Sequence, residues 1–239
     1  MKYLGSKNRI AKHILPIMLE YRTPEMTWVE PFVGGANMID KVEGSRIGAD
    51  LNEYLIEALI LIRDHPEKIP DLITEDDYQR LKDEMKVDGI TGFAGFAMSF
   101  GGKFFGGYRR DVAGTKGCIE NMKTQTRRSK QNAIKQSEKL KGVKLVNCSY
   151  DELPLSIGNC LIYCDPPYEG TTSYRDGFDH TKFWNWCREM SDRGHVVFIS
   201  EYNAPDDFRC VWQKEVATTV SKQQGKKGLE KLFIAPQGQ

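Results

Sequence analysis

The stretch Thr27-Trp28-Val29-Glu30-Pro31-Phe32-Val33-Gly34-Gly35-Ala36-Asn37 reads as a short apolar strand over 27–32 that runs into a glycine turn. β-Branched and aromatic residues followed by paired glycines are typical of a strand that ends at a tight turn. We expect a helix over 36–42, a second strand over 45–50 and an apolar helix over 51–63. Strands that alternate with helices in this way predict an α/β fold with a doubly wound parallel sheet.

The same pattern extends outward to both ends of the chain but is interrupted in the middle. A helix is expected over 8–20, and further strands over 143–147, 161–164, 196–199 and 231–234. Between them, 64–88 is polar, 89–118 is rich in glycine and aromatic residues, and 119–141 is typical of a basic helix. The sequence therefore predicts a core domain made of residues 1–60 plus 142–239, with a mostly helical lobe inserted at 61–141.

Length and composition limit the class of protein. A chain of 239 residues is long enough for one α/β domain that carries an inserted lobe. No apolar run approaches the roughly 20 residues of a membrane span, and the first residues do not read as a signal peptide. The six cysteines form no CxxC pair, so we expect no metal site and reduced thiols in a cytoplasmic protein.

Charge is nearly balanced overall but is concentrated in the predicted lobe. Between Lys103 and Lys144 there are 12 Lys or Arg and three Asp or Glu, a net charge of +9 within a chain of net charge +1. A local positive stretch of this kind provides the potential that phosphates need. A solvated helix face would show the same pattern, so charge alone favours neither reading.

The tetrapeptide Asp165-Pro166-Pro167-Tyr168 directly follows the apolar stretch 161–164. In an open α/β sheet, ligands lie beyond the carboxyl ends of the strands, which is where this tetrapeptide is expected. A carboxylate and a rigidly held carbonyl can accept hydrogen bonds from an aromatic NH2 group, whose lone pair is otherwise delocalised into the ring. Tyr168 supplies a flat face for a base that has left the duplex. These residues predict methylation of the exocyclic amine of adenine.

The glycine turn is paired with an acid at the end of the next strand. Gly34 and Gly35 allow the backbone to approach a nucleoside cofactor, and Asp50 is placed to bind ribose hydroxyls. This pair would suit NAD equally well, and only the neighbouring tetrapeptide distinguishes the two cofactors.

Taken together, these residues resemble the Dam-like, D12 class, DNA adenine-N6 methyltransferases. The segments that carry the resemblance are Tyr3 to Lys7, Glu30 to Gly35, Asp50, Ser149-Tyr150, Asp165 to Tyr168, Thr171 to Tyr174 and Gly101 to Arg110. The resemblance implies a Rossmann-like methyltransferase sheet with an inserted DNA-recognition lobe. It also implies base flipping and direct in-line transfer from S-adenosylmethionine to adenine in double-stranded DNA.

The resemblance assigns three sets of residues. The catalytic set is Asp165, Pro166, Pro167 and Tyr168. The cofactor-binding set is Tyr3, Lys7, Glu30, Pro31, Phe32, Gly34, Gly35, Asp50, Ser149, Tyr150 and Asp165. The DNA-binding set is Lys103, Tyr108, Arg109, Arg110, Lys116, Lys123, Arg127, Arg128, Lys130 and Tyr174.

Within the DNA-binding set, we expect Arg127 and Arg128 to contact phosphates and Arg109 or Arg110 to contact a base. The neighbouring aromatics Phe104 and Phe105 suit either the DNA or the core of the lobe itself.

Several assignments stay open. Many relatives have an acid before the aromatic residue at 149–150, so either Ser149 or Asp151 is the cofactor contact. Glu201 lies just past a strand and is an even choice for lining the pocket, whereas Asp179 is expected to cap a helix over 182–191. An RNA amine methyltransferase and a non-catalytic DNA-binding module remain alternatives. The resemblance is compatible with a bacterial or phage-encoded monomer or weak dimer, with or without a partner restriction endonuclease.

Overall fold

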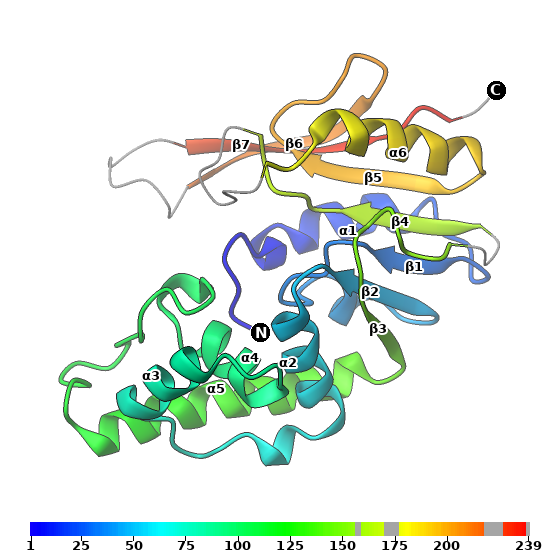
Figure 1. The fold of residues 1–239 in the computed structure, drawn as a ribbon. Helices are drawn as coiled ribbons and strands as arrows, with labels where there is room; N and C mark the ends of the chain where they lie inside the picture. Colours follow the sequence, from blue (N-terminus) through cyan, green and yellow to red (C-terminus); the bar gives the residue numbers. More distant parts are fainter. Residues whose placement is uncertain (156–158, 170–176, 218–226, 238–239) are drawn as a thin grey trace.

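The computed structural model describes residues 1–155, 159–169, 177–217 and 227–237, and within them seven strands form one sheet (Figure 1). The strands are β1 (Thr27–Glu30), β2 (Arg46–Asp50), β3 (Val143–Asn147), β4 (Cys160–Cys164), β5 (Val196–Glu201), β6 (Arg209–Ala217) and β7 (Lys227–Ile234). Their order across the sheet is β3-β2-β1-β4-β5-β7-β6. The strands β1 to β5 run parallel, whereas β7 is antiparallel to both β5 and β6. The predicted doubly wound α/β fold is confirmed.

The order of the strands reverses between β1 and β4. From β1 the chain moves to β2 and β3 on one side, and from β4 it moves to β5 on the other side. Such a reversal leaves a crevice beyond the carboxyl ends of the two central strands, where open α/β sheets bind ligands. The glycine turn follows β1 and Asp165 follows β4, so both flank this crevice.

Helices cover the two faces of the sheet and form a separate group beside it. The helical elements are η1 (Lys7–Arg9), α1 (Ala11–Leu19), η2 (Ile39–Lys41), α2 (Glu53–Asp64), η3 (Pro66–Lys68), α3 (Glu75–Glu84), α4 (Gly89–Ala97), η4 (Phe100–Gly102), α5 (Ile119–Leu140) and α6 (His180–Asp192). Local sequence sets several of their starts. The Thr74 side chain and Asp77 form a capping box for α3, and Asp179 caps α6 by accepting the Lys182 N–H, as predicted.

Alternate residues of the central strands enter two separate cores. Trp28 and Tyr163 lie in the core that also contains α1, α2 and α4. Val29 and Ile162 lie in the core on the opposite face, which α6 covers with a cluster of aromatic residues. Two-sided burial explains why the central strands read as continuous apolar runs.

Helices α3, α4 and α5 gather away from the end of the sheet that contains β5, β7 and β6, in cyan to green in Figure 1. The backbones of α2 and α4 approach closely, because a Cβ atom at Gly92 would lie 1.9 Å from the carbonyl oxygen of Tyr54. The predicted boundary at residue 60 falls inside α2, which extends to Asp64. We keep the division into a core domain and a lobe as a proposal.

Two elements differ most from the sequence prediction. The helix expected over 36–42 is only the short η2, because Ala36 adopts a left-handed backbone with φ of 56° and interrupts a helix there. Strand β6 was missed because it is an edge strand and mixes polar with apolar residues, so it shows no clear alternation. No helix in the described part of the chain is long and apolar enough to span a membrane.

Candidate active site

Asp165 begins the tetrapeptide immediately after β4 and is held by a buried lysine. The Lys7 Nζ lies 3.2 Å from Asp165 Oδ1 and 3.4 Å from Glu230 Oε2. It also lies 4.3 Å from the centroid of the Tyr168 ring. Lys7 comes from η1 and Glu230 from β7, so three segments that are distant in sequence meet at the end of β4.

The charge states of this group follow from its burial. Burial raises the pKa of Asp165 to about 6, although the ammonium of Lys7 opposes that rise and Glu230 adds to it. For Lys7, burial lowers the pKa, but the carboxylates of Asp165 and Glu230 outweigh it and the net shift is upward. At neutral pH Asp165 is therefore a carboxylate that can accept hydrogen bonds, and Lys7 is an ammonium.

Tyr168 is oriented by a residue that sequence reasoning missed. Its hydroxyl donates to Glu230 Oε2 at 2.8 Å, and its ring meets Tyr202 edge-on with a centroid distance of 4.6 Å. Glu230 lies in a strand that was expected only from residue 231 onward. It is an acid between basic and apolar neighbours and belongs to no recognisable motif. No local pattern links it to Tyr168, which is 62 positions away.

Glu201, at the end of β5, supports the segment that follows the tetrapeptide. Its carboxylate accepts the Glu169 N–H at 3.2 Å and the Tyr202 N–H at 2.7 Å. Burial raises the pKa of Glu201 to about 7, against the effect of these two hydrogen bonds. Glu201 therefore lies beside the site and holds the backbone at Glu169 and Tyr202.

The glycine turn is fixed from one side by Asp50 and from the other by Tyr3. Asp50 accepts the Gly34 N–H at 3.2 Å and the Asn52 N–H at 3.0 Å. Gly34 has a φ of +49°, and a Cβ atom there would lie 2.9 Å from Tyr3 Cε1. Burial raises the pKa of Asp50 to about 6, with both hydrogen bonds acting in the opposite direction. The turn therefore requires glycine for both its backbone conformation and its contact with Tyr3.

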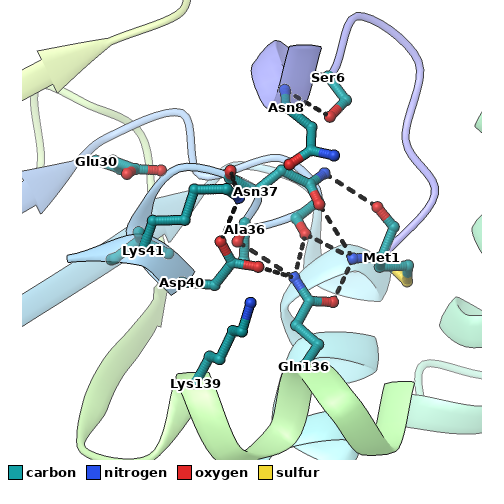
Figure 2. A network of polar contacts seen from close by, with 12 residues as sticks. Met1, Ser6, Asn8, Glu30, Ala36, Asn37, Asp40, Lys41, Gln136 and Lys139 are labelled. Atoms are coloured by element: carbon teal, nitrogen blue, oxygen red, sulfur yellow. Dashed lines mark hydrogen bonds and ion pairs between the residues drawn. The ribbon is translucent and has the colours of Figure 1, made fainter. Parts of the chain in front are cut away.

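A polar network ties the same turn to α5 (Figure 2). The side-chain amide of Gln136 donates to the carbonyl oxygens of Gly35 at 3.0 Å and Ala36 at 3.2 Å, and to Asp40 Oδ2 at 3.2 Å. The amino group of Met1 donates to the same Gly35 carbonyl at 3.0 Å. These donors hold the backbone where Ala36 adopts its unfavourable left-handed conformation.

The end of β1 presents one buried acid and one aromatic ring. Glu30 is buried, accepts the Trp28 Nε1–H at 2.8 Å, and has a pKa that burial raises well above the usual range. Pro31 is buried, and Phe32 stacks on Tyr150 with a centroid distance of 5.5 Å. Phe32 and Tyr150 therefore form an aromatic pair beside the glycine turn.

The open choice between Ser149 and Asp151 involves two residues that contact each other. The Ser149 hydroxyl donates to the Asp151 carboxylate, which also forms an ion pair with Lys182. Ser149 N–H is bonded to Glu152. Both side chains therefore have protein partners, and this arrangement favours neither as the cofactor contact.

The residues at this edge of the sheet fit a nucleoside cofactor. They combine an aromatic pair, a glycine turn and the Asp50 carboxylate beside it. A purine ring fits the aromatic pair of Phe32 and Tyr150, and ribose hydroxyls can donate to the Asp50 carboxylate. In the described ranges, no group of three or more His, Cys, Asp or Glu could hold a metal ion.

Two predicted DNA contacts lie in the interior of the helical group. The Tyr108 side chain is buried and donates its hydroxyl to the Ile73 carbonyl at 2.7 Å. Arg109 is also buried, donates to Ser129 Oγ at 2.5 Å and pairs with Asp111 at 3.2 Å. Each side chain therefore holds the 108–111 segment to its neighbours, and its contact with DNA stays a prediction that this burial does not support.

The neighbouring aromatics serve the same interior. Phe104 packs on Phe96 with a centroid distance of 4.8 Å, and Phe105 packs on Tyr78 at 5.0 Å. Of the two readings left open for Phe104 and Phe105, the core of the helical group is the one that the structure supports.

The other predicted DNA contacts lie at the surface, with one exception. Lys103, Arg110, Lys116, Arg127 and Arg128 are exposed, and Lys123 and Lys130 are half-buried. Ion pairs join Arg110 to Glu75, Lys123 to Glu120 and Lys130 to Asp71. Tyr174 falls outside the described residues.

One exposed aromatic was not predicted. Phe100 is 74% exposed and lies in η4, where Gly101 and Gly102 both have positive φ. This turn abuts the N-terminal segment, since the Leu4 N–H donates to the Gly102 carbonyl at 3.2 Å. The paired glycines at 101–102 were a signal for the turn, but the sequence does not show that the turn contacts the N-terminal segment.

Comparisons with known proteins agree with this geometry. The family model described as D12 class N6 adenine-specific DNA methyltransferase matches residues 3–101 and 102–224. A search of curated proteins finds no match.

Two solved structures were also compared. "Putative methyltransferase yhhF from Escherichia coli" has 9% identity and a TM-score of 0.42, over 99% of this chain and 90% of that chain. A structure of "SMU.472, a putative methyltransferase complexed with SAH" has 14% identity and a TM-score of 0.38, over 98% of this chain and 54% of that chain.

The family match spans nearly the whole chain and includes the glycine turn, Asp50 and the tetrapeptide. It implies S-adenosylmethionine as the cofactor, in agreement with the nucleoside-binding features at the carboxyl ends of β1 and β2. This chain belongs to the D12 class N6 adenine-specific DNA methyltransferase family.

Proposed function

We propose that this methyltransferase modifies the N6 amine of adenine in double-stranded DNA, with the target base flipped out of the duplex. The observation that carries the proposal is the Asp165 carboxylate, held by Lys7 at the point where the strand order reverses. This position suits a group that acts on a ligand shared between the two halves of the sheet.

The residues of the tetrapeptide perform the chemistry that the amine requires. Asp165 and the Pro166 carbonyl accept the two N6 hydrogens, which draws the nitrogen toward tetrahedral geometry and frees its lone pair. Bound S-adenosylmethionine supplies an electrophilic methyl group on its sulfonium. The amine nitrogen would accept this methyl group, and Asp165 would take up the excess proton of that nitrogen along its hydrogen bond.

Cofactor binding is assigned to the glycine turn and its neighbours. Asp50 accepts hydrogen bonds from the ribose hydroxyls, and Phe32 with Tyr150 contacts the adenine ring of the cofactor. Gly34 and Gly35 let the backbone approach without interference from a side chain.

DNA contact is assigned to the exposed part of the basic stretch. Arg127 and Arg128 on α5 bind phosphates, and Arg110 and Lys103 lie on the segment that faces the duplex. Phe100 is an exposed aromatic on a glycine turn, which suits insertion between bases as the target adenine leaves the stack.

The test is methyl transfer from isotopically labelled S-adenosylmethionine to duplex DNA, single-stranded DNA and RNA of matched sequence content. We expect label in duplex DNA, recovered as N6-methyladenine after digestion to nucleosides. Label confined to RNA would favour the RNA amine methyltransferase, and binding of DNA without any transfer would favour a non-catalytic module.

A further inference from the structure

Glu230 is joined to two residues of the active site at once. Its Oε2 lies 3.4 Å from Lys7 Nζ and accepts the Tyr168 hydroxyl at 2.8 Å. Lys7 reaches Asp165 at 3.2 Å from the other side. All three charged side chains are at least three-quarters removed from solvent, with exposures of 9% for Lys7, 22% for Asp165 and 16% for Glu230.

Two carboxylates therefore share one buried ammonium. Charges that are shielded from water interact more strongly than those at a surface, so the position of Lys7 between the two acids affects both. The other titratable groups near Asp165 come from β1, β4, the segment that follows β4, and the end of β5. They are Glu30, Tyr163, Cys164, Tyr168, Glu201 and Tyr202. Glu230 is the acid in this group that also bonds to Tyr168.

We propose that Glu230 is a positioning residue for methyl transfer, which holds the Tyr168 ring and limits how far Lys7 neutralises Asp165. The inference rests on the proposed role of Asp165 as an acceptor for the target amine. Glu230 gains this role from β7, the antiparallel strand that pairs with β5 and brings its acid beside the end of β4.

The direction of the expected pH effect follows from the charges. Asp165 must be a carboxylate to accept the amine hydrogens, so the transfer rate falls as pH drops through its pKa of about 6. The negative charge of Glu230 raises that pKa and the positive charge of Lys7 lowers it. The acid limb is the part of the pH–rate profile where the rate falls as pH drops. Removing Glu230's charge should move this limb to lower pH, and removing Lys7's charge should move it to higher pH.

Three variants separate the two parts of the role. Glu230→Gln removes the charge but keeps an oxygen that can accept the Tyr168 hydroxyl. We expect its acid limb to lie about one pH unit lower, the scale of a close charge interaction, and that of Lys7→Met about one unit higher. Glu230→Ala also loses the hydrogen bond to Tyr168, so its plateau rate should fall about tenfold below that of Glu230→Gln.

The experiment measures single-turnover transfer rates across pH 4.5–8.5 (a span on the order of four units, centred near the Asp165 pKa), with Glu189→Gln as control. Glu189 is exposed and pairs with Arg193, so its variant removes one surface acid from α6, a helix that carries none of Lys7, Asp165 and Glu230. A second readout, the pH titration of 13C-labelled carboxyl groups by NMR, follows Asp165 without turnover and is assigned with Asp165→Asn.

Opposite shifts in Glu230→Gln and Lys7→Met, absent from Glu189→Gln, would support the proposal. An unmoved Asp165 titration and acid limb in Glu230→Gln would overturn it, even if DNA is methylated. If the Asp165 titration shifts as expected while the parent protein methylates no DNA, the positioning role stands and the proposed substrate is wrong.

Discussion

The side-chain amide of Gln136 donates to the carbonyl oxygen of Gly35 at 3.0 Å, and this contact joins α5 to the glycine turn after β1. The same amide donates at 3.2 Å to the carbonyl of Ala36 (Figure 2). Ala36 itself has a left-handed backbone with φ of 56°. Helix α5 carries Arg127 and Arg128 at its surface. One helix therefore contacts the turn assigned to the cofactor and carries the residues assigned to DNA phosphates.

Gln136→Leu should weaken S-adenosylmethionine binding by roughly 5- to 30-fold, since it removes donors worth about 1–2 kcal/mol in total from the turn. Isothermal calorimetry measures the change, and thermal unfolding checks that the variant is folded. Gln131→Leu is the control, because Gln131 is exposed on the same helix. Parent-like affinity in a folded Gln136→Leu protein would show that the turn does not depend on this contact.

Asp50→Ala should weaken S-adenosylmethionine binding by about 1.5–3 kcal/mol, the scale of a hydrogen bond to a charged group. Two effects contribute, because Asp50 is assigned to the ribose hydroxyls and also accepts the Gly34 N–H. DNA affinity should change little. Asp64→Ala, which removes an acid paired with Arg63 at the end of α2, is the matched control. An unchanged cofactor dissociation constant for Asp50→Ala would refute the ribose assignment.

Arg127→Ala and Arg128→Ala should each weaken binding to target and non-target DNA alike and reduce the salt slope by roughly one unit. Both side chains are exposed on α5, where they are free to reach phosphates. Arg109→Ala provides the contrast, because Arg109 is buried against Ser129 and should cost about 1–3 kcal/mol of stability instead. Fluorescence anisotropy across a salt series measures the slopes. Parent-like slopes in both α5 variants would place the DNA elsewhere.

Phe100→Ala should reduce extrusion of the target base, since an exposed aromatic that enters the stack compensates for the base that leaves. With 2-aminopurine at the target position, the parent protein should raise fluorescence on binding and the variant should raise it less. Val87→Ala removes another exposed apolar side chain of the helical group and should behave like the parent. An equal fluorescence rise in Phe100→Ala and the parent would rule out the wedge role.

The fold was predictable where buried strands lie next to glycine turns. Strands β1, β4 and β5 were found because they are fully buried, which gives largely apolar sequences. Edge strand β6 lacks that pattern, and the helix expected after Gly35 is shortened by contacts with Gln136, which is about 100 residues away.

The candidate site likewise contains residues that short motifs mark and residues that only the folded structure brings there. Asp165, Lys7 and the Gly34–Asp50 pair were placed in the candidate site because short motifs mark them. Glu230 and Phe100 carry no motif, and their positions depend on strand pairing and on packing against the N-terminal segment. Sequence shows an arginine beside an aromatic at Arg109 and Tyr108, but it does not show that both side chains are buried.

The central claim is that Asp165 acts on the target amine, and Asp165→Asn tests it most directly. The amide keeps the size of the side chain but loses the negative charge that draws the amine toward tetrahedral geometry. The measurement is the single-turnover rate of N6-methyladenine formation in duplex DNA, beside the S-adenosylmethionine dissociation constant of the same protein. We predict a rate at least about 100-fold lower with cofactor affinity within a few-fold of the parent. A near-parental rate in Asp165→Asn would contradict the account.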